Sequence, residues 1–383
     1  MANLITSGEA YDPFFYANMA LRQLNKVLGM ARLVYRGFDR TPMDKGSIIK
    51  LRRPGKFSAQ AMPIALVSAS DVLPEYLQVS LDQWYGTMFK LTDLELTYTR
   101  DQMVNEHIGP GAIGVADEID QSLVGLQDDV GYFLVRHATI PFNDFPDVRQ
   151  ILFTNQNPGS PRRYGVGPAL QNNYEKDAVF VQADSSADGG QLQREGILVR
   201  KFGFDIFANQ NFTSHTAGDM AATAGALTNT AQDRGSTTLA IDDATALTGT
   251  LNKGDSLSIA GDPTRYACTA DTTAGGNAAI IPISPALQQD VGDGVAVTLR
   301  IVDASERGVA FHPEAFALAM VPLSSMGDGA GARIGTAVDP ITGIALRSTV
   351  FYDPGTAANY VRMDALWGRK TLDPQLAVNV EIP

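Results

Sequence analysis

Three runs close the chain and decide how its fold is organised: RGVAFHPEAFALAMVPL at residues 307–323, AVDPITGIALRSTVFYDP at 337–354 and YVRMDALWGRKTLDPQLAVNVEIP at 360–383. Apolar stretches alternate with Pro- and Gly-containing turn signals, which is typical of a mixed region of helices and strands. The character of the chain changes just before residue 301. The closing runs therefore predict the second part of a domain that begins earlier in the chain.

Residues 213–300, which precede these runs, have a different composition. They contain one aromatic residue, Tyr266, although the whole chain has 17 Phe, 12 Tyr and 2 Trp. They are rich in Thr, Ala, Gly and Asp. Short alternating apolar runs such as Leu257/Ile259 lie between turn signals such as Gly261-Asp262-Pro263. This pattern predicts a small β barrel or sandwich inserted into another domain.

Upstream of residue 213, apolar spacing predicts further elements. With 383 residues, the chain is long enough for two or three domains. Residues 14–34 have the spacing of an amphipathic helix or of two short helices, and residues 46–98 predict a long hairpin. Residues 112–138 predict one long helix, and a shorter helix is expected from Asp147 to about Asn155. We expect the acidic residues of the long helix to face solvent: Asp117, Glu118, Asp120, Asp128 and Asp129.

The net charge of −12 is unevenly distributed along the chain. Residues 1–60 hold 10 Lys/Arg and 4 Asp/Glu, whereas residues 61–160 hold 4 and 14. Such blocks suggest that copies of the chain attract one another, or that the first block meets an acidic partner. Ordinary solvated faces are the alternative. The overall acidity argues against tight nucleic-acid binding, which needs a concentrated basic surface.

The sequence contains little that indicates secretion, membrane insertion or an oxidising compartment. The single cysteine, Cys268, excludes an intrachain disulfide. The N-terminus lacks the pattern of a signal peptide, and no run approaches the ~18–20 apolar residues of a membrane helix. We therefore expect synthesis in the cytoplasm and no membrane partner.

A search for catalytic or metal-binding patterns returns no candidate. The four histidines lack metal-ligand spacing, so we expect no metal and no cofactor. The glycine-rich residues 327–332 lack the β–α–β setting of a phosphate loop and predict a mobile surface loop. Acidic pairs such as Asp242/Asp243 are interpreted as solubility groups, and His312, before Pro313, as a capping or packing residue. The chain is predicted not to be an enzyme.

Contact residues are expected at the predicted hairpin and near the N-terminus. The basic hairpin residues could pair with carboxylates of a neighbouring subunit, and large apolar residues close to a terminus need a cover. Packing of the apolar residues on the chain's own core is the alternative. The candidate inter-subunit residues are Phe14, Phe15, Lys50, Arg52, Arg53 and Lys56.

Taken in order, the three closing runs resemble the end of tailed-bacteriophage major capsid proteins. The branch they resemble is the podovirus coat-protein family, which has a Hong Kong 97-like fold with an inserted β domain. The resemblance implies a helix beginning near His312-Pro313-Glu314 and a strand pair around residues 339–343. It also implies a last strand that follows a turn at residues 368–372. Gly254-Asp255 and Gly261 match the turn-and-strand pattern of that family's inserted domain.

The resemblance implies an α+β fold with five parts. They are an N-terminal arm (1–45), an extended hairpin loop (46–98), a spine helix with the peripheral domain and the first part of the axial domain (99–212), an inserted small β barrel (213–300) and the remainder of the axial domain with closing peripheral strands (301–383).

The function that the resemblance implies is self-assembly into the icosahedral shell of a tailed bacteriophage. The implied partners are further copies in hexamers and pentamers, a scaffolding protein, a portal protein and, only weakly, packaged DNA. The implied location is the virion, after synthesis in the host bacterial cytoplasm. The alternative is an extracellular or tail-associated binding protein whose Thr/Gly-rich β domain recognises a glycan or receptor.

Overall fold

The computed structural model describes residues 13–36, 48–53, 75–92, 104–155, 157–181, 196, 198, 200–323, 332–339, 343–356 and 358–382. In these residues the chain is α+β, as expected, and it divides into two compact units. The described parts of Met1–Lys26, Arg36–Val115 and Leu318–Lys370 form unit 1, and those of Val27–Tyr35, Ala116–Ala317 and Thr371–Pro383 form unit 2. Within the described ranges, no helix is long and apolar enough to span a membrane.

Unit 1 is built on a five-stranded sheet in the order β18-β21-β20-β19, with β3 also paired to β21. Its strands are β3 (Gln83–Thr92), β18 (Phe316–Met320), β19 (Ala332–Val338), β20 (Ala345–Asp353) and β21 (Ala358–Thr371). A separate antiparallel pair joins β1 (Ile48–Arg53) to β2 (Glu75–Ser80). Its helices are α1 (Pro13–Val27), a π-helix (Val104–Ile108) and the start of α3 (Gly109–Val124).

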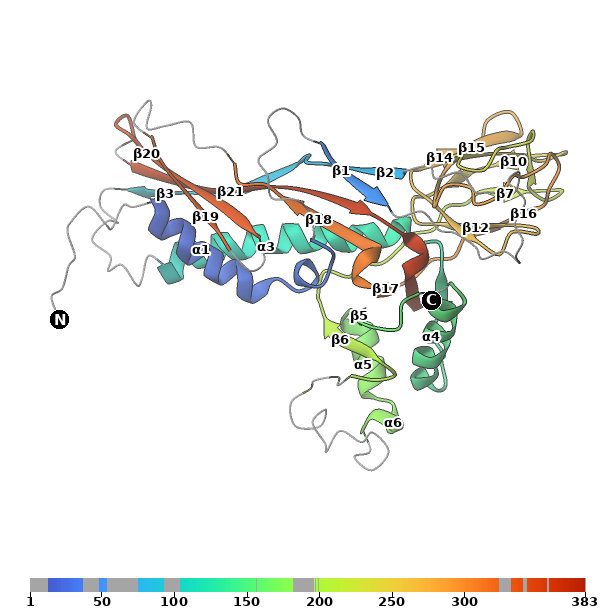
Figure 1. Ribbon diagram of the computed structural model, residues 1–383, viewed down its shortest axis with the longest axis horizontal. Coiled ribbons are helices and arrows are strands. Elements are labelled where there is room, and N and C mark those ends of the chain that lie inside the picture. The colour runs from blue at the N-terminus through green and yellow to red at the C-terminus, as the bar shows by residue number, and fades with distance from the viewer. Residues whose placement is uncertain are drawn as a thin grey trace, which may run out of the picture. The chain divides into compact units, whose positions relative to one another are not determined.

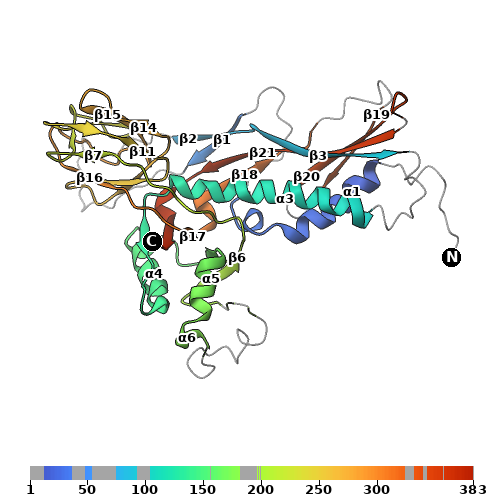
Figure 2. The same cartoon turned by 180° about the vertical axis from the view of Figure 1, so that it is seen from behind.

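One face of this sheet packs on the helices. Side chains alternate along a strand, so Val361, Met363 and Trp367 on β21 share that face and are buried. Gly111 on α3 permits close approach, because a Cβ there would lie 2.5 Å from Cε of Met363. A Cβ at Gly335 on β19 would likewise meet the backbone at the start of α1. Both views show α1 and α3 on the same side of the sheet (Figures 1 and 2).

Unit 2 contains a second five-stranded sheet in the order β4-β22-β17-β5-β6. Three of its strands precede residues 213–300 and two follow them, so the chain returns to this sheet after residue 300. The strands are β4 (Phe133–Val135), β5 (Arg162–Val166), β6 (Phe204–Ala208), β17 (Glu306–Phe311) and β22 (Ala377–Ile382). The helices near it are α4 (Asp144–Thr154), α5 (Pro168–Glu175) and α6 (Ala178–Val181) (Figure 1).

Short 3₁₀ turns complete the helical elements: Met30–Arg32, Gly125–Asp129, Pro141–Asn143, Pro313–Ala315 and Pro374–Leu376. The core beside the sheet of unit 2 is rich in aromatic residues, among them Phe145, Tyr164, Tyr174, Phe180 and Phe204.

Residues 213–300, called the β-rich segment below, have an apolar core of their own, which includes Leu239, Leu257 and Ile281. The six-stranded sheet runs β16-β12-β13-β15-β9-β8. The strands are β7 (Ala221–Ala222), β8 (Leu227–Thr228), β9 (Thr238–Asp242), β10 (Leu247–Thr248), β11 (Thr250–Leu251), β12 (Ser256–Ile259), β13 (Arg265–Cys268), β14 (Thr272–Thr273), β15 (Ala278–Ser284) and β16 (Val297–Arg300).

The predicted long helix over 112–138 is wrong at its C-terminal end. Regular helix stops at Val124, a 3₁₀ turn follows, and Phe133–Val135 form β4. Two distant interactions account for this. β4 pairs in parallel with Asn379–Glu381 of β22, and the Asn379 side chain donates hydrogen bonds to the carbonyls of Gln127 and Val130. Tertiary pairing therefore overrides the local apolar spacing.

Two details implied at residues 312 and 368 are also wrong. Pro313–Ala315 form only a 3₁₀ turn between β17 and β18, and β18 continues the chain as a strand. Gly368 lies within β21 and not in a turn. Glycine suits this position in the strand, because a Cβ there would collide with the carbonyl of Ser80. The turn before β22 lies at Asp373–Leu376 instead, where Asp373 caps the backbone N–H of Gln375.

Several local predictions are confirmed. Residues 14–34 contain α1 and the 3₁₀ turn at Met30–Arg32, and the helix expected near Asp147 is α4. The strand pair around residues 339–343 is the antiparallel pair β19–β20. Of the loop predicted at residues 327–332, residues 327–331 lie outside the described ranges, and Ala332 is instead the first residue of β19.

Candidate functional site

The structure describes only part of the predicted contact set. Phe14 and Phe15 lie at the start of α1, where Phe14 is 54% exposed and Phe15 is partly exposed. Lys50, Arg52 and Arg53 lie on β1, but their side chains are not among those described. Lys56 lies outside the described residues. A contact role for the six residues remains a prediction.

A group of ion pairs, which the sequence did not reveal, joins the β-rich segment to the sheet of unit 2. Its centre is Arg307 on β17, whose side chain is 2% exposed. Its Nε lies 2.9 Å from Oε1 of Glu381, and its Nη1 lies 3.6 Å from Oδ1 of Asp128. Nη2 donates a hydrogen bond of 3.2 Å to the carbonyl of Gly254 in the β-rich segment. A buried charge needs such partners to remain charged.

A second arginine completes this junction. Arg300, at the end of β16, donates a 2.6 Å hydrogen bond to Oε2 of Glu381. Its guanidinium also lies 3.4 Å from the centroid of the Phe133 ring, and that of Arg265 lies 4.6 Å from the same centroid. Glu381 therefore forms ion pairs with arginines of two different strands, β16 and β17. The Phe133 ring of β4 forms cation–π contacts with arginines of two strands of the β-rich segment, β13 and β16.

Backbone approach tightens the same junction. A Cβ at Gly131 would lie 2.7 Å from the carbonyl carbon of Tyr266 and 2.8 Å from the carbonyl oxygen of Arg265. Lys253 adds an ion pair to Asp128 at 3.6 Å. Burial raises the pKa of Asp128, although the charges of Lys253 and Arg307 act in the opposite direction. The junction thus combines close packing with opposite charges.

Asp120 on α3 corrects the expectation of a solvent-facing acidic helix. It is buried, and its carboxylate accepts hydrogen bonds from the backbone N–H groups of Gly29 at 2.6 Å and Ala31 at 3.0 Å. Burial raises its pKa, while those two amides act to lower it. The side chain therefore fixes the segment that follows α1 onto α3.

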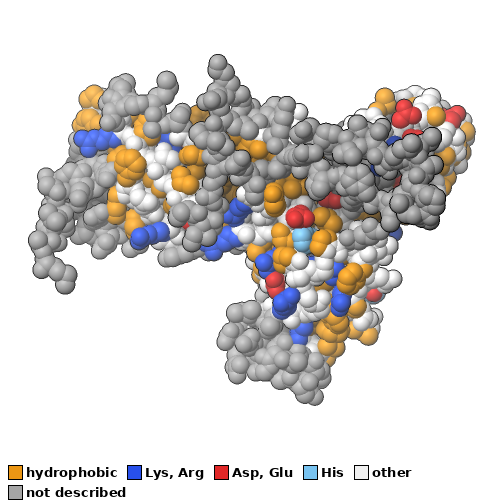
Figure 3. All heavy atoms as spheres, in the orientation of Figure 1, with side chains coloured by type: hydrophobic (Ala, Val, Ile, Leu, Met, Phe, Trp, Pro, Cys, Tyr) orange, Lys and Arg blue, Asp and Glu red, His pale blue; other side chains and the backbone are white. Residues whose placement is uncertain are grey.

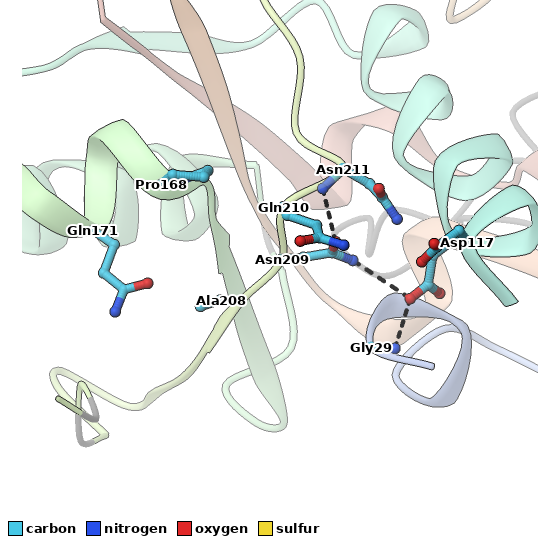
Figure 4. Close-up of a pocket in the computed structure, with 9 residues that line it drawn as sticks. Gly29, Asp117, Pro168, Gln171, Ala208, Asn209, Gln210 and Asn211 are labelled. Carbon is cyan, nitrogen blue, oxygen red and sulfur yellow. Dashed lines mark hydrogen bonds between the residues drawn. The ribbon is translucent and has the colours of Figure 1, made fainter. Parts of the chain in front are cut away.

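A pocket of about 340 Å³ opens beside this carboxylate (Figure 4). Asp117 lines it from α3, and Asn209, Gln210 and Asn211 line it from the segment after β6. Asn209 is itself ordered, because its Oδ1 accepts a 2.9 Å hydrogen bond from the backbone N–H of Asn211. Carboxylates and amides share the lining with the apolar Pro168 and Ala208, so the pocket offers both polar and apolar surface.

Two aspartates in the β-rich segment bind backbone groups, and for Asp243 this corrects the expected role of a solubility group. Asp243 is buried and accepts hydrogen bonds from the backbone N–H groups of Thr245, Ala246 and Ala224. These bonds, with that from Thr245 the strongest, lower its pKa. Asp255 holds three groups in the same way: the N–H of Gly218, the N–H of Asn252 and the ring of His215. Carboxylates thus order the loops of a segment that has few aromatic residues.

The outer face of the unit 1 sheet presents large apolar side chains. Trp84 and Met88 on β3 are 59% and 60% exposed. Trp84 is oriented by a 3.1 Å hydrogen bond from its Nε1 to Asp364, which also accepts two hydrogen bonds from Arg347. Exposed apolar patches of this kind are typical of interaction surfaces.

The histidines serve structure where they are described. His312 accepts a 3.3 Å hydrogen bond at Nδ1 from the N–H of Glu314, which confirms its predicted capping role. Among the described residues, no group of three or more His, Cys, Asp or Glu side chains could hold a metal ion. Cys268 is buried, and burial raises its pKa to about 11.

Comparisons with known proteins give matches only among solved structures. No protein-family model and no curated protein sequence matches the chain. A chain from Mycobacterium phage Che8 is 14% identical with a TM-score of 0.52, and the match covers 92% of this chain and 90% of that chain. This similarity shows a shared fold over nearly the whole length.

Two further similar chains come from a capsid structure of the cyanophage P-SCSP1u and from the mature capsid of bacteriophage PhiM1. The first is 10% identical with a TM-score of 0.48 and coverages of 93% and 88%. The second is 11% identical with a TM-score of 0.42 and coverages of 91% and 89%.

Proposed function

We propose that this chain is a major capsid protein that self-assembles into the icosahedral shell of a tailed bacteriophage. The observation that carries the proposal is the fold, which the chain shares over 92% of its length with a chain of Mycobacterium phage Che8. The order of the closing runs, which resembles that of coat proteins, supports it. A structural role without catalysis fits the contacts described above, in which charged side chains hold elements together.

The five parts of a Hong Kong 97-like coat protein can be assigned to this chain as part of the proposal. The arm is 1–45, the extended hairpin loop 46–98, the spine helix with the peripheral and first axial parts 99–212, the insert 213–300 and the remainder 301–383. The β1–β2 pair supports the hairpin, and the sheet that joins β5 and β6 to β17 and β22 supports an interrupted axial domain.

A closed barrel is proposed for the insert. Its sheet path runs from β16 to β8, and hydrogen bonds return from β8 to the segment that leads into β16. The Thr228 N–H donates to the carbonyl of Val295, and the Val297 N–H donates to the carbonyl of Ala226. These bonds support closure, because a closed sheet leaves no unpaired edge strand.

The proposed partners follow from the shell. Copies would meet in hexamers and pentamers, where many modest contacts add up. A scaffolding protein and a portal protein would act during assembly, and packaged DNA would be held only weakly. The contact residues are Phe14, Phe15, Lys50, Arg52, Arg53 and Lys56. The proposed location is the virion, after synthesis in the host cytoplasm.

Assembly of the purified chain tests the function. We expect megadalton particles in size-exclusion chromatography and closed shells in negative-stain electron microscopy, with a scaffolding protein co-expressed if the chain alone stays soluble. A monomer or trimer under all these conditions would contradict the proposal and favour a binding protein that uses the β-rich segment.

The hairpin contacts have their own test. The double variant Arg52→Glu/Arg53→Glu should lose particles while its far-ultraviolet circular dichroism stays unchanged. Lys176→Glu, at an exposed position outside the hairpin, is the charge-reversal control and should assemble. Normal shells from the double variant would remove the hairpin from the contact set.

A further inference from the structure

Arg162, the first residue of β5, is a buried charge that lacks a counter-ion in the described part of the chain. The residue is 2% exposed, and its Nε and Nη2 atoms have no hydrogen-bond partner among the described residues. Its neighbour Arg163 shows the ordinary arrangement, because it forms an ion pair with Asp205. The buried Arg307 likewise has Glu381. Arg162 differs from both, and an uncompensated buried cation is costly.

The surroundings of Arg162 add positive charge. Its guanidinium lies 4.3 Å from the centroid of the Phe153 ring, and the guanidinium of Arg149 lies 5.1 Å from the same centroid. Burial, and secondarily the charge of Arg149, lower the pKa of Arg162. Two cations on one ring repel each other, so an anion placed between or beside them would be stabilised by both.

The cluster reaches the molecular surface. Phe153 is 50% exposed and Arg149 is exposed, both on the last two turns of α4. Figure 3 shows basic and apolar side chains next to one another on the part that carries α4 and α5. An exposed aromatic ring with arginines beside it has the composition of a protein-interaction hot spot.

We infer that Arg149, Phe153 and Arg162 form a contact site for a carboxylate of a second copy of this chain. The inference rests on the proposed function, which brings many copies together. Charge complementarity selects the occupant: the chain has 42 Asp and Glu against 30 Lys and Arg, so each copy offers an excess of carboxylates. Two arginines are too few to compete for the phosphates of a nucleic acid at physiological salt.

If Arg162 binds a carboxylate of a second copy, its replacement should weaken self-association without lowering the stability of the unassembled chain. In the unassembled chain, Arg162→Met removes an unpaired buried cation, so the denaturant midpoint should stay the same or rise. In the assembled state, the partner carboxylate loses its arginine, so self-association should weaken about tenfold or more. An arginine needed only for folding would instead lower the midpoint.

The test measures both quantities on the full chain. Urea unfolding of the unassembled protein gives stability, and sedimentation velocity across a concentration series gives self-association. Arg149→Ala, at an exposed position, is the second variant and should weaken association without loss of stability. Arg163→Met is the matched control, since its partner is within the chain, and it should associate as the wild type does.

Each outcome is decisive. Weaker association of both variants with unchanged or higher stability supports the site. Wild-type association of the variants overturns it and leaves the proposed function standing, whereas a wild-type chain that stays monomeric both alone and with a co-expressed scaffolding protein overturns both. Loss of affinity for a double-stranded DNA probe, with self-association unchanged, would replace the second copy by a phosphate and overturn the assignment.

Discussion

Replacement of Glu381 by Gln tests whether buried charge holds the β-rich segment to the sheet of unit 2. The side chain keeps its shape but loses its charge, which leaves Arg307 and Arg300 without their shared carboxylate. Removal of one partner from a buried ion pair costs about 3–5 kcal/mol. Arg307 keeps Asp128 at 3.6 Å and the carbonyl of Gly254, so we expect the lower end of that range.

The expected loss can be measured as a thermal shift. About 3 kcal/mol corresponds to roughly 6–12 °C in a unit of 150–250 residues. Differential scanning calorimetry of the unassembled chain gives this shift, and Glu314→Gln is the control. Glu314 carries the same charge at a 60% exposed position, so its variant should change stability by no more than about 0.5 kcal/mol.

Two results would refute the reasoning. A Glu381→Gln variant that melts within about 1 °C of the wild type would show that the two arginines do not need the carboxylate. The triple variant Arg300→Met/Arg307→Met/Glu381→Leu replaces Glu381 and both of its arginines by apolar groups, while Asp128 keeps Lys253. It should be more stable than Glu381→Gln, because no buried charge loses its only partner. If the triple variant is as unstable as Glu381→Gln, packing and not charge accounts for the loss.

Three further predictions follow from other contacts. Burial raises the pKa of Asp144 to about 6, so the folded state favours its protonated form. The resulting stabilisation is present below about pH 4 and is lost as the pH rises through 6. Asp144→Asn should flatten this dependence of the unfolding free energy on pH, measured by urea unfolding at a series of pH values. Gly131→Ala should destabilise by about 1–3 kcal/mol, because the new Cβ meets backbone, whereas Gly159→Ala has nothing within 4 Å and should be neutral in the same thermal melts. Asp120→Ala should speed hydrogen exchange at the Gly29 amide by about tenfold, and an unchanged rate would show that the carboxylate does not hold this segment.

Local patterns in the sequence predicted the elements whose cause is local. The three- and four-residue steps of residues 14–34 correspond to α1, and the helix expected from Asp147 corresponds to α4. The aromatic-poor composition of 213–300 predicted a separate β core, which the structure contains. In each case spacing and turn residues carry enough information, because the partners lie close in sequence.

Features set by distant partners could not be predicted. Phe133–Val135 continue a helical apolar pattern, and only their pairing with β22 makes them a strand. The sequence predicted that Asp120 and Asp243 are exposed carboxylates. Only the structure shows that backbone N–H groups donate hydrogen bonds to both of them. The junction at Arg307 and the unpaired Arg162 depend in the same way on residues far away along the chain. A single sequence contains no signal for such pairings.

The point where the β-rich segment leaves the host sheet has a practical consequence. His215 and Ala304 exchange two backbone hydrogen bonds, of 2.8 and 3.0 Å. The chain segment that enters the β-rich segment therefore lies next to the one that leaves it. A foreign module whose own ends are close together could be spliced there without stretching the host chain. The graft would have to supply a carbonyl in place of that of Gly254, since Arg307 stays behind on β17, and cations in place of Arg300 and Lys253, since Glu381 and Asp128 also stay behind. The charges of this junction therefore set the design requirement for any module inserted there.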